Sequence, residues 1–74
     1  MKYYVVNGII MKDETTPQSV FCYDSKDDAF SVYHTTLASN YANKDIRSFF
    51  VCILDSYGVQ INRESFDTEH PLVS

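Results

Sequence analysis

The sequence predicts a small α+β domain in which one helix packs on one face of a four-stranded antiparallel sheet. Three observations predict this fold. Residues 3–11 and 49–54 are strongly apolar and rich in the strand-favouring residues Val, Ile, Tyr and Phe. Residues 29–41 repeat apolar side chains at a helical spacing. Two shorter strand-like stretches, at 20–23 and 59–66, complete the element order ββαββ.

The first predicted strand, residues 3–11, is apolar on both of its alternating sets of side chains. One set comprises Tyr3, Val5, Ile9 and Met11, and the other comprises Tyr4, Val6 and Ile10. A strand that is apolar on both sides is usually covered on both sides. Residues 13–17 are polar and end in a proline, which predicts a loop leading to the second strand at 20–23.

The predicted helix begins after Ser25, whose hydroxyl we expect to accept a hydrogen bond from the backbone amide of Asp28 as an N-cap. Asp27 and Asp28 then lie in the first turn, where the positive end of the helix dipole favours carboxylates. Asn43 and Lys44 are typical of a helix end. The stripe expected to face the sheet is formed by Phe30, Tyr33, Leu37 and Tyr41, with Ala29 and Ala38 at its edges.

The rest of the chain supplies two more strands. Residues 49–54 are apolar on both alternating sets, and Gly58 in the following turn is placed for a left-handed conformation. Residues 59–66 alternate apolar and polar side chains, as expected of a half-exposed strand at a sheet edge. We therefore expect a single domain over residues 1–66 and a flexible C-terminal tail over residues 67–74.

The strand order follows from the direction of successive elements. If each element reverses the chain, the third strand is antiparallel to the first and can pair with it. The predicted order is 2-1-3-4, counted along the chain. It places the two strands that are apolar on both sides in the centre and the two weaker strands at the edges, so that hydropathy and topology agree. One helix covers only one face of this sheet, which leaves the other face apolar and unprotected.

Composition and charge limit the class of protein. The chain has 74 residues and a net charge of −4, with a pI near 4.8. This acidity argues against nucleic-acid backbones and anionic membranes, which attract basic proteins. The apolar run at residues 3–11 is too short and too polar for a signal sequence or a membrane span. Two cysteines are too few for a secreted disulfide scaffold, so we expect a cytoplasmic protein without nucleic-acid or membrane partners.

Neither the histidines nor the cysteines form a recognisable catalytic or metal-binding pattern. His34 lies on the predicted helix and His70 in the predicted tail, without the spacing of metal ligands. Cys22 and Cys52 lie on strands that flank the first strand. Their Cα atoms should therefore be about 10 Å apart, which is beyond disulfide reach. We interpret both as buried structural thiols.

Two further patterns have structural explanations. Asp24, Asp27 and Asp28 lack the alternating ligands and central glycine of a calcium loop, and capping of the helix explains them. The aromatic residues within 3–4 and 47–51 suggest an RNA-binding platform, but the glycines, the element order and the charge of such domains are missing. No phosphate-binding loop, nucleophile elbow or zinc motif is present. We therefore predict a protein that is not an enzyme and uses no cofactor or metal.

Two segments carry a resemblance to known proteins. Residues 2–10, KYYVVNGII, and residues 23–34, YDSKDDAFSVYH, resemble small uncharacterised proteins of low-GC Gram-positive bacteria and their phages. The resemblance spans most of the chain and includes no residue that is diagnostic of an activity. It implies a bacterial or phage origin and carries over no function.

The leading hypothesis is a non-catalytic interaction protein that acts as a homodimer through the open sheet face. The sequence does not decide which strand face meets the helix; the residues assigned to the interface are Tyr3, Val5, Phe49, Val51 and Ile53. One alternative is a small acidic inhibitor, of the kind that phages encode, which presents carboxylates to a basic host enzyme. Another is a small-ligand-binding module, with its site between helix and sheet or at the dimer seam.

Overall fold

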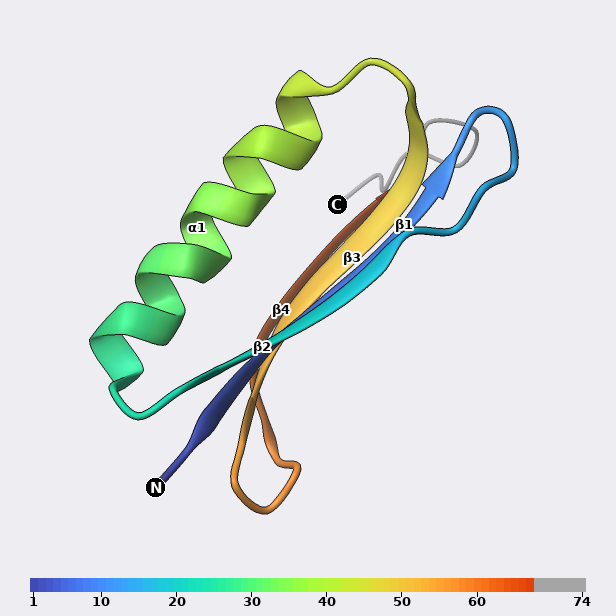
Figure 1. Cartoon of the computed structure of the whole chain (residues 1–74). Helices are drawn as coiled ribbons and strands as arrows, with labels where there is room; N and C mark the ends of the chain where they lie inside the picture. The colour runs from blue at the N-terminus through green and yellow to red at the C-terminus, as the bar shows by residue number, and fades with distance from the viewer. Residues whose placement is uncertain (68–74) are drawn as a thin grey trace.

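The computed structural model describes residues 1–67 and confirms the predicted ββαββ fold. Its elements are β1 (Tyr3–Met11), β2 (Gln18–Tyr23), α1 (Lys26–Ala42), β3 (Ile46–Asp55) and β4 (Gln60–Asp67). The four strands form one antiparallel sheet in the predicted order β2-β1-β3-β4. Figure 1 shows α1 lying along one face of the sheet, and no other described element lies against the opposite face.

The C-terminal boundary differs by one residue from the prediction. Asp67, which the sequence places in the tail, is the last residue of β4 and pairs with Ser48 of β3. The rest of the predicted flexible tail lies outside the described residues, and so does His70. Gly58 adopts the predicted left-handed conformation, with a φ of 79°.

The helix begins as predicted, and the stripe that it buries agrees with the predicted one only in part. Ser25 Oγ accepts a hydrogen bond from the Asp28 backbone N at 3.4 Å, which confirms the N-cap. At the other end, the backbone N–H of Asn43 donates to the Asn40 carbonyl. The buried residues are Ala29, Tyr33, Leu37 and Asn40, whereas Phe30 is half-buried and Tyr41 is half-exposed. The helix therefore also turns Asn40 towards the sheet, while the half-exposed ring of Tyr41 still lies against Phe49 and Phe66, with ring centroids 5.0 and 5.5 Å away.

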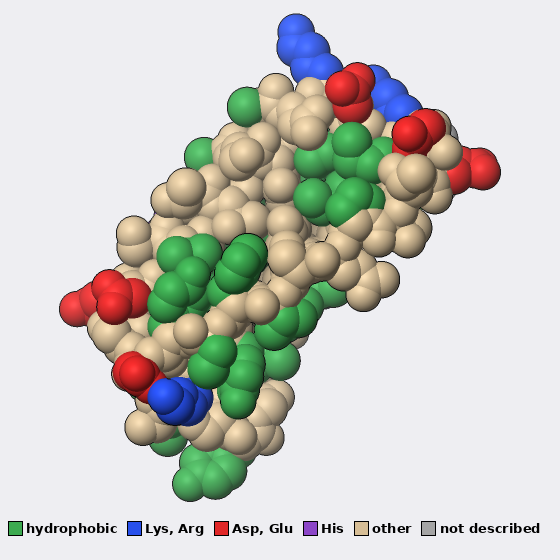
Figure 2. All heavy atoms as spheres, in the orientation of Figure 1, with side chains coloured by type: hydrophobic (Ala, Val, Ile, Leu, Met, Phe, Trp, Pro, Cys, Tyr) green, Lys and Arg blue, Asp and Glu red, His purple; other side chains and the backbone are tan. Residues whose placement is uncertain are grey.

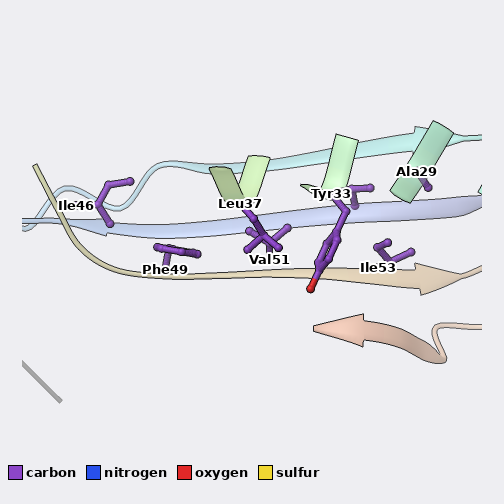
Figure 3. Packing of buried hydrophobic residues seen from close by; sticks show 8 residues of the cluster. Ala29, Tyr33, Leu37, Ile46, Phe49, Val51 and Ile53 are labelled. Atoms are coloured by element: carbon purple, nitrogen blue, oxygen red, sulfur yellow. The ribbon is translucent and has the colours of Figure 1, made fainter. Parts of the chain in front are cut away.

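The core lies between α1 and the odd-numbered side chains of the central strands. The register places Val5 opposite Ile53 and Asn7 opposite Val51. Asn40 Nδ2 donates to Asn7 Oδ1 at 3.0 Å, so that this buried pair of polar groups is satisfied where the helix meets the sheet. The apolar cluster, most of it labelled in Figure 3, comprises Val5, Ala29, Tyr33, Leu37, Ile46, Phe49, Val51 and Ile53.

This arrangement corrects the residues assigned to the interface. Val5, Phe49, Val51 and Ile53 are buried beneath α1, and Tyr3 packs against the same core. The prediction chose the set of side chains that the helix covers. The reason is that both alternating sets of the central strands are apolar, so hydropathy does not distinguish them. The even-numbered set is the one that the helix leaves uncovered.

Candidate functional site

The sheet face opposite α1 carries the even-numbered side chains of β1, β2 and β3. Residues directly opposite each other in antiparallel strands project to the same face, and Val6 lies opposite both Val20 and Cys52. On β4, Arg63 lies opposite Cys52 and shares this face. We call this surface the open face. It comprises Tyr4, Val6, Gly8, Ile10, Gln18, Val20, Cys22, Ser48, Phe50, Cys52, Leu54, Gln60, Arg63, Ser65 and Asp67.

Several large apolar side chains of the open face remain in contact with solvent. Tyr4, Phe50 and Ile10 expose 36%, 38% and 41% of their surface, and Val20 on the outer strand exposes 63%. Scattered apolar residues are normal on protein surfaces, but a contiguous group on one face indicates an interaction surface. None of the elements in residues 1–67 covers this group.

Gly8 and Phe50, which lie opposite each other on β1 and β3, shape the middle of the open face. A Cβ atom added to Gly8 would lie 2.3 Å from Cε1 of Phe50, closer than carbon atoms approach in proteins. The Phe50 ring therefore lies against the Gly8 backbone and occupies the space that a side chain would fill. An aromatic ring that covers a strand glycine in this way compensates for its missing side chain.

A groove of about 670 Å³ runs over the part of the open face near the β1–β2 loop. Its apolar lining includes Val6, Ile10, Val20 and Phe50, and its polar lining includes Thr16, Gln18, Ser48, Arg63, Ser65 and Asp67. Small-molecule sites in proteins have volumes of about 300–1,000 Å³ and combine apolar walls with a few polar groups. The groove therefore has the size and composition of a site that could hold a small molecule or part of a partner protein.

The open face carries two opposite charges on β4. Arg63 and Asp67 are four residues apart, so both project to this face. Burial raises the pKa of the Cys52 thiol, and the positive charge of Arg63 opposes part of that rise. Cys52 is therefore a neutral thiol at physiological pH. On the side of the molecule drawn in Figure 2, charged side chains gather towards the two ends, and the middle is neutral.

The two cysteines both lie on the open face but differ in exposure. Both are free, as predicted. Cys52 on central strand β3 is only 7% exposed, whereas Cys22 is exposed on β2, one of the two edge strands of the sheet. The expectation of two buried thiols is therefore right for Cys52 and wrong for Cys22.

The histidine and the aspartates that the sequence offers as candidate ligands do not come together in a site. His34 is exposed on α1 beside the rings of Phe30 and Tyr33. Asp24 forms an ion pair with Lys2 at the surface. Within the part of the chain that the structure describes, no three side chains of the metal-ligating types gather at one point.

The chain matches no family model, no curated protein and no solved structure. No helix among the described residues is long and apolar enough to cross a membrane. A functional assignment therefore depends on the geometry of the open face.

Proposed function

We propose that this chain is a non-catalytic interaction protein that forms a homodimer through its open face. The observation that carries the proposal is the contiguous group of exposed apolar side chains there, among them Tyr4, Ile10, Val20 and Phe50. Each Å² of apolar surface removed from water contributes about 25 cal/mol. A second copy would remove this surface from water on both protomers, because in a two-fold dimer the same patch lies on each side.

The charges of the open face favour such an axis. Arg63 and Asp67 lie two residues to either side of Ser65 on β4. Consider a two-fold axis that lies between the two sheets, runs perpendicular to the strands and passes over Ser65. This axis would place Arg63 of each protomer near Asp67 of the other. Ser65 lies opposite Phe50, which lies opposite Gly8. The same axis would therefore bring the two Phe50 rings together at the centre, between sheets about 10 Å apart.

Light scattering tests the proposal through the mass of the protein in solution at micromolar concentration. We expect a dimer for the wild type and a monomer for Ile10→Glu, because this substitution places a carboxylate among the apolar side chains of the open face. The matched control is Val59→Glu. Val59 is 59% exposed and follows the turn between β3 and β4, outside the open face. A monomeric wild-type protein with an intact fold would contradict the proposal.

A charge exchange tests the orientation of the two protomers. Arg63→Asp and Asp67→Arg should each weaken the dimer, because each places like charges opposite each other across the axis. The double variant should restore much of the affinity. A double variant that is as weak as the sum of the two single variants would show that these residues do not meet across the interface.

The groove supports a second candidate function, the binding of a small apolar molecule. Its volume of about 670 Å³ exceeds that of the hollow between the end of α1 and the sheet, which is about 300 Å³. The fluorescent apolar anion anilinonaphthalene sulfonate is a suitable probe. Saturable binding that Ile10→Glu removes and Val59→Glu retains would favour a ligand site. Weak binding without saturation would leave the homodimer as the better account.

A further inference from the structure

Among residues 1–67, no strand pairs with the outer edge of β2. The Ile9 N–H donates to the Pro17 carbonyl at 3.0 Å, and the Met11 N–H donates to the Thr15 carbonyl at 2.8 Å. Hydrogen-bonded pairs alternate with non-bonded pairs along an antiparallel ladder. Continuing from Pro17 along β2, the residues whose backbone groups bond to β1 are therefore the odd-numbered ones, which lie opposite odd-numbered residues of β1. The backbone groups of Gln18, Val20 and Cys22 point away from β1.

The two edge strands of the sheet differ in how they protect their edges. Proteins commonly place charged residues on an edge strand, because these prevent pairing with another chain. β4 has Arg63 and Glu64 at its middle, whereas β2, with the sequence QSVFCY, has no charged residue. Val20 and Phe21 on β2 expose 63% and 43% of their surface. The edge of β2 is therefore apolar, and no strand of the described chain covers it.

Carboxylates flank this neutral strand at both ends. The residues before it include Lys12, Asp13 and Glu14, and those after it include Asp24, Lys26, Asp27 and Asp28. Lys2 pairs with Asp24. Counted over the side chains of these two segments and Lys2, there are two acids against one base before β2 and three acids against two bases after it.

The charges argue against a second copy of β2 as the occupant of this edge. A two-fold antiparallel pairing of β2 with its copy would place the acidic start of one strand beside the acidic end of the other. A strand with basic residues on both sides of an apolar centre does not have this disadvantage, because its charges complement those at the ends of β2.

We propose that the outer edge of β2 is a docking site for an extended peptide segment of a partner protein, with alternating apolar residues flanked by lysine or arginine. The backbone groups of Val20 and Cys22 bind the peptide by extending the sheet, which is a common mode of peptide recognition. Alternate side chains of the peptide lie beside Val20 on the open face and beside Phe21 on the helix side. The site does not depend on the homodimer.

Fluorescence anisotropy with a fluorescein-labelled synthetic peptide tests the site. The peptide has the sequence Lys-Lys-Val-Thr-Val-Thr-Val-Lys-Lys. Val20→Pro removes one outward N–H and leaves the ladder with β1 intact, so it should weaken binding about tenfold or more. Val20→Thr keeps the N–H and the branched shape and should bind within about threefold of wild type. The Ile10→Glu protein should also bind the peptide, which separates this test from that of the homodimer.

Two further measurements decide the proposal even if Val20→Pro does not fold. On peptide binding, hydrogen exchange should slow at the Val20 and Cys22 amides and change little at Phe21, whose amide already bonds to β1. A peptide with Glu in place of each Lys, and one with Pro in place of each Thr, should bind at least about tenfold more weakly. No binding of the lysine peptide at millimolar concentration, equal binding of the glutamate peptide, or protection elsewhere than on β2 would overturn the proposal.

Discussion

The two faces of the sheet carry similar side chains but meet different environments. On the side of α1, Val5, Val51 and Ile53 are fully buried, whereas on the open face Tyr4 and Phe50 expose 36% and 38% of their surface. Because side chains alternate along a strand, each central strand presents one apolar set to each face. The position of the helix therefore decides which set becomes the core, and composition alone does not.

The comparison separates two roles within the same strands. Side chains beneath α1 stabilise the fold, so changes there should appear as a loss of folding free energy. Side chains on the open face would contact the partner in the proposed homodimer, so changes there should appear mainly in assembly. Four predictions test or refine this division.

Ile53→Ala should cause the largest loss of stability. Ile53 is fully buried, and truncating such a residue costs about 2–5 kcal/mol. Ile10→Ala is the same change on the open face, where the side chain is 41% exposed. It should cost the protomer less than about 1 kcal/mol. Urea unfolding followed by tyrosine fluorescence, at concentrations low enough to dissociate a dimer, measures both. Equal losses would contradict the division between the two faces.

The buried hydrogen bond beneath the helix provides the second prediction. Asn40→Leu removes the donor to Asn7 Oδ1 and leaves that oxygen buried without it. This should cost about 1–3 kcal/mol. The double variant Asn7→Val with Asn40→Leu replaces both partners with apolar groups, so it should recover most of the loss. Urea unfolding of the single and double variants measures the coupling. A double variant that is less stable than either single one would mean that the pair does not act as a unit.

Features that depend on local sequence could be predicted before the structure was known. The N-cap at Ser25 and the left-handed Gly58 each follow from residues within one turn. The strand order follows from the contrast between the apolar and the more polar strands. The buried position of Asn40 could not be predicted in this way. Its partner Asn7 is 33 residues away, and a stripe defined by hydropathy passes over asparagine.

The identity of the open face required tertiary information. β2 and β3 are both antiparallel to β1 and therefore parallel to each other, joined through α1. Such connections are almost always right-handed, which fixes the side of the sheet on which the helix lies. Which side chains point to that side also depends on the register of β1 with β2. The loop between them has no two-residue turn signal, so the sequence does not predict this register. In the structure, the loop includes Glu14 in a left-handed conformation, with a φ of 72°.

The cysteines show that the open face is not uniformly exposed. Cys22 is exposed, whereas Cys52 is 7% exposed and burial raises its pKa. Because the thiolate is the reactive form, Cys22 should react about tenfold faster or more with iodoacetamide near neutral pH. Peptide mass spectrometry over time measures the two rates, and denaturant should make them similar. Faster reaction of Cys52 than of Cys22 in the folded protein would contradict the described face.

The smallest effect is expected at the start of α1, which belongs to neither face. Ser25→Ala removes the hydroxyl that accepts from the Asp28 N–H and should cost about 0.5–2 kcal/mol. The distance of 3.4 Å is long for such a bond, so the lower half of this range is expected.

Ser31→Ala is the matched control. Ser31 is exposed, and only its backbone carbonyl accepts a hydrogen bond, from Thr35, which the substitution leaves unchanged. Urea unfolding should resolve the difference. Equal and negligible losses at both positions would mean that Asp27 and Asp28, through their charge at the helix start, stabilise it without the cap.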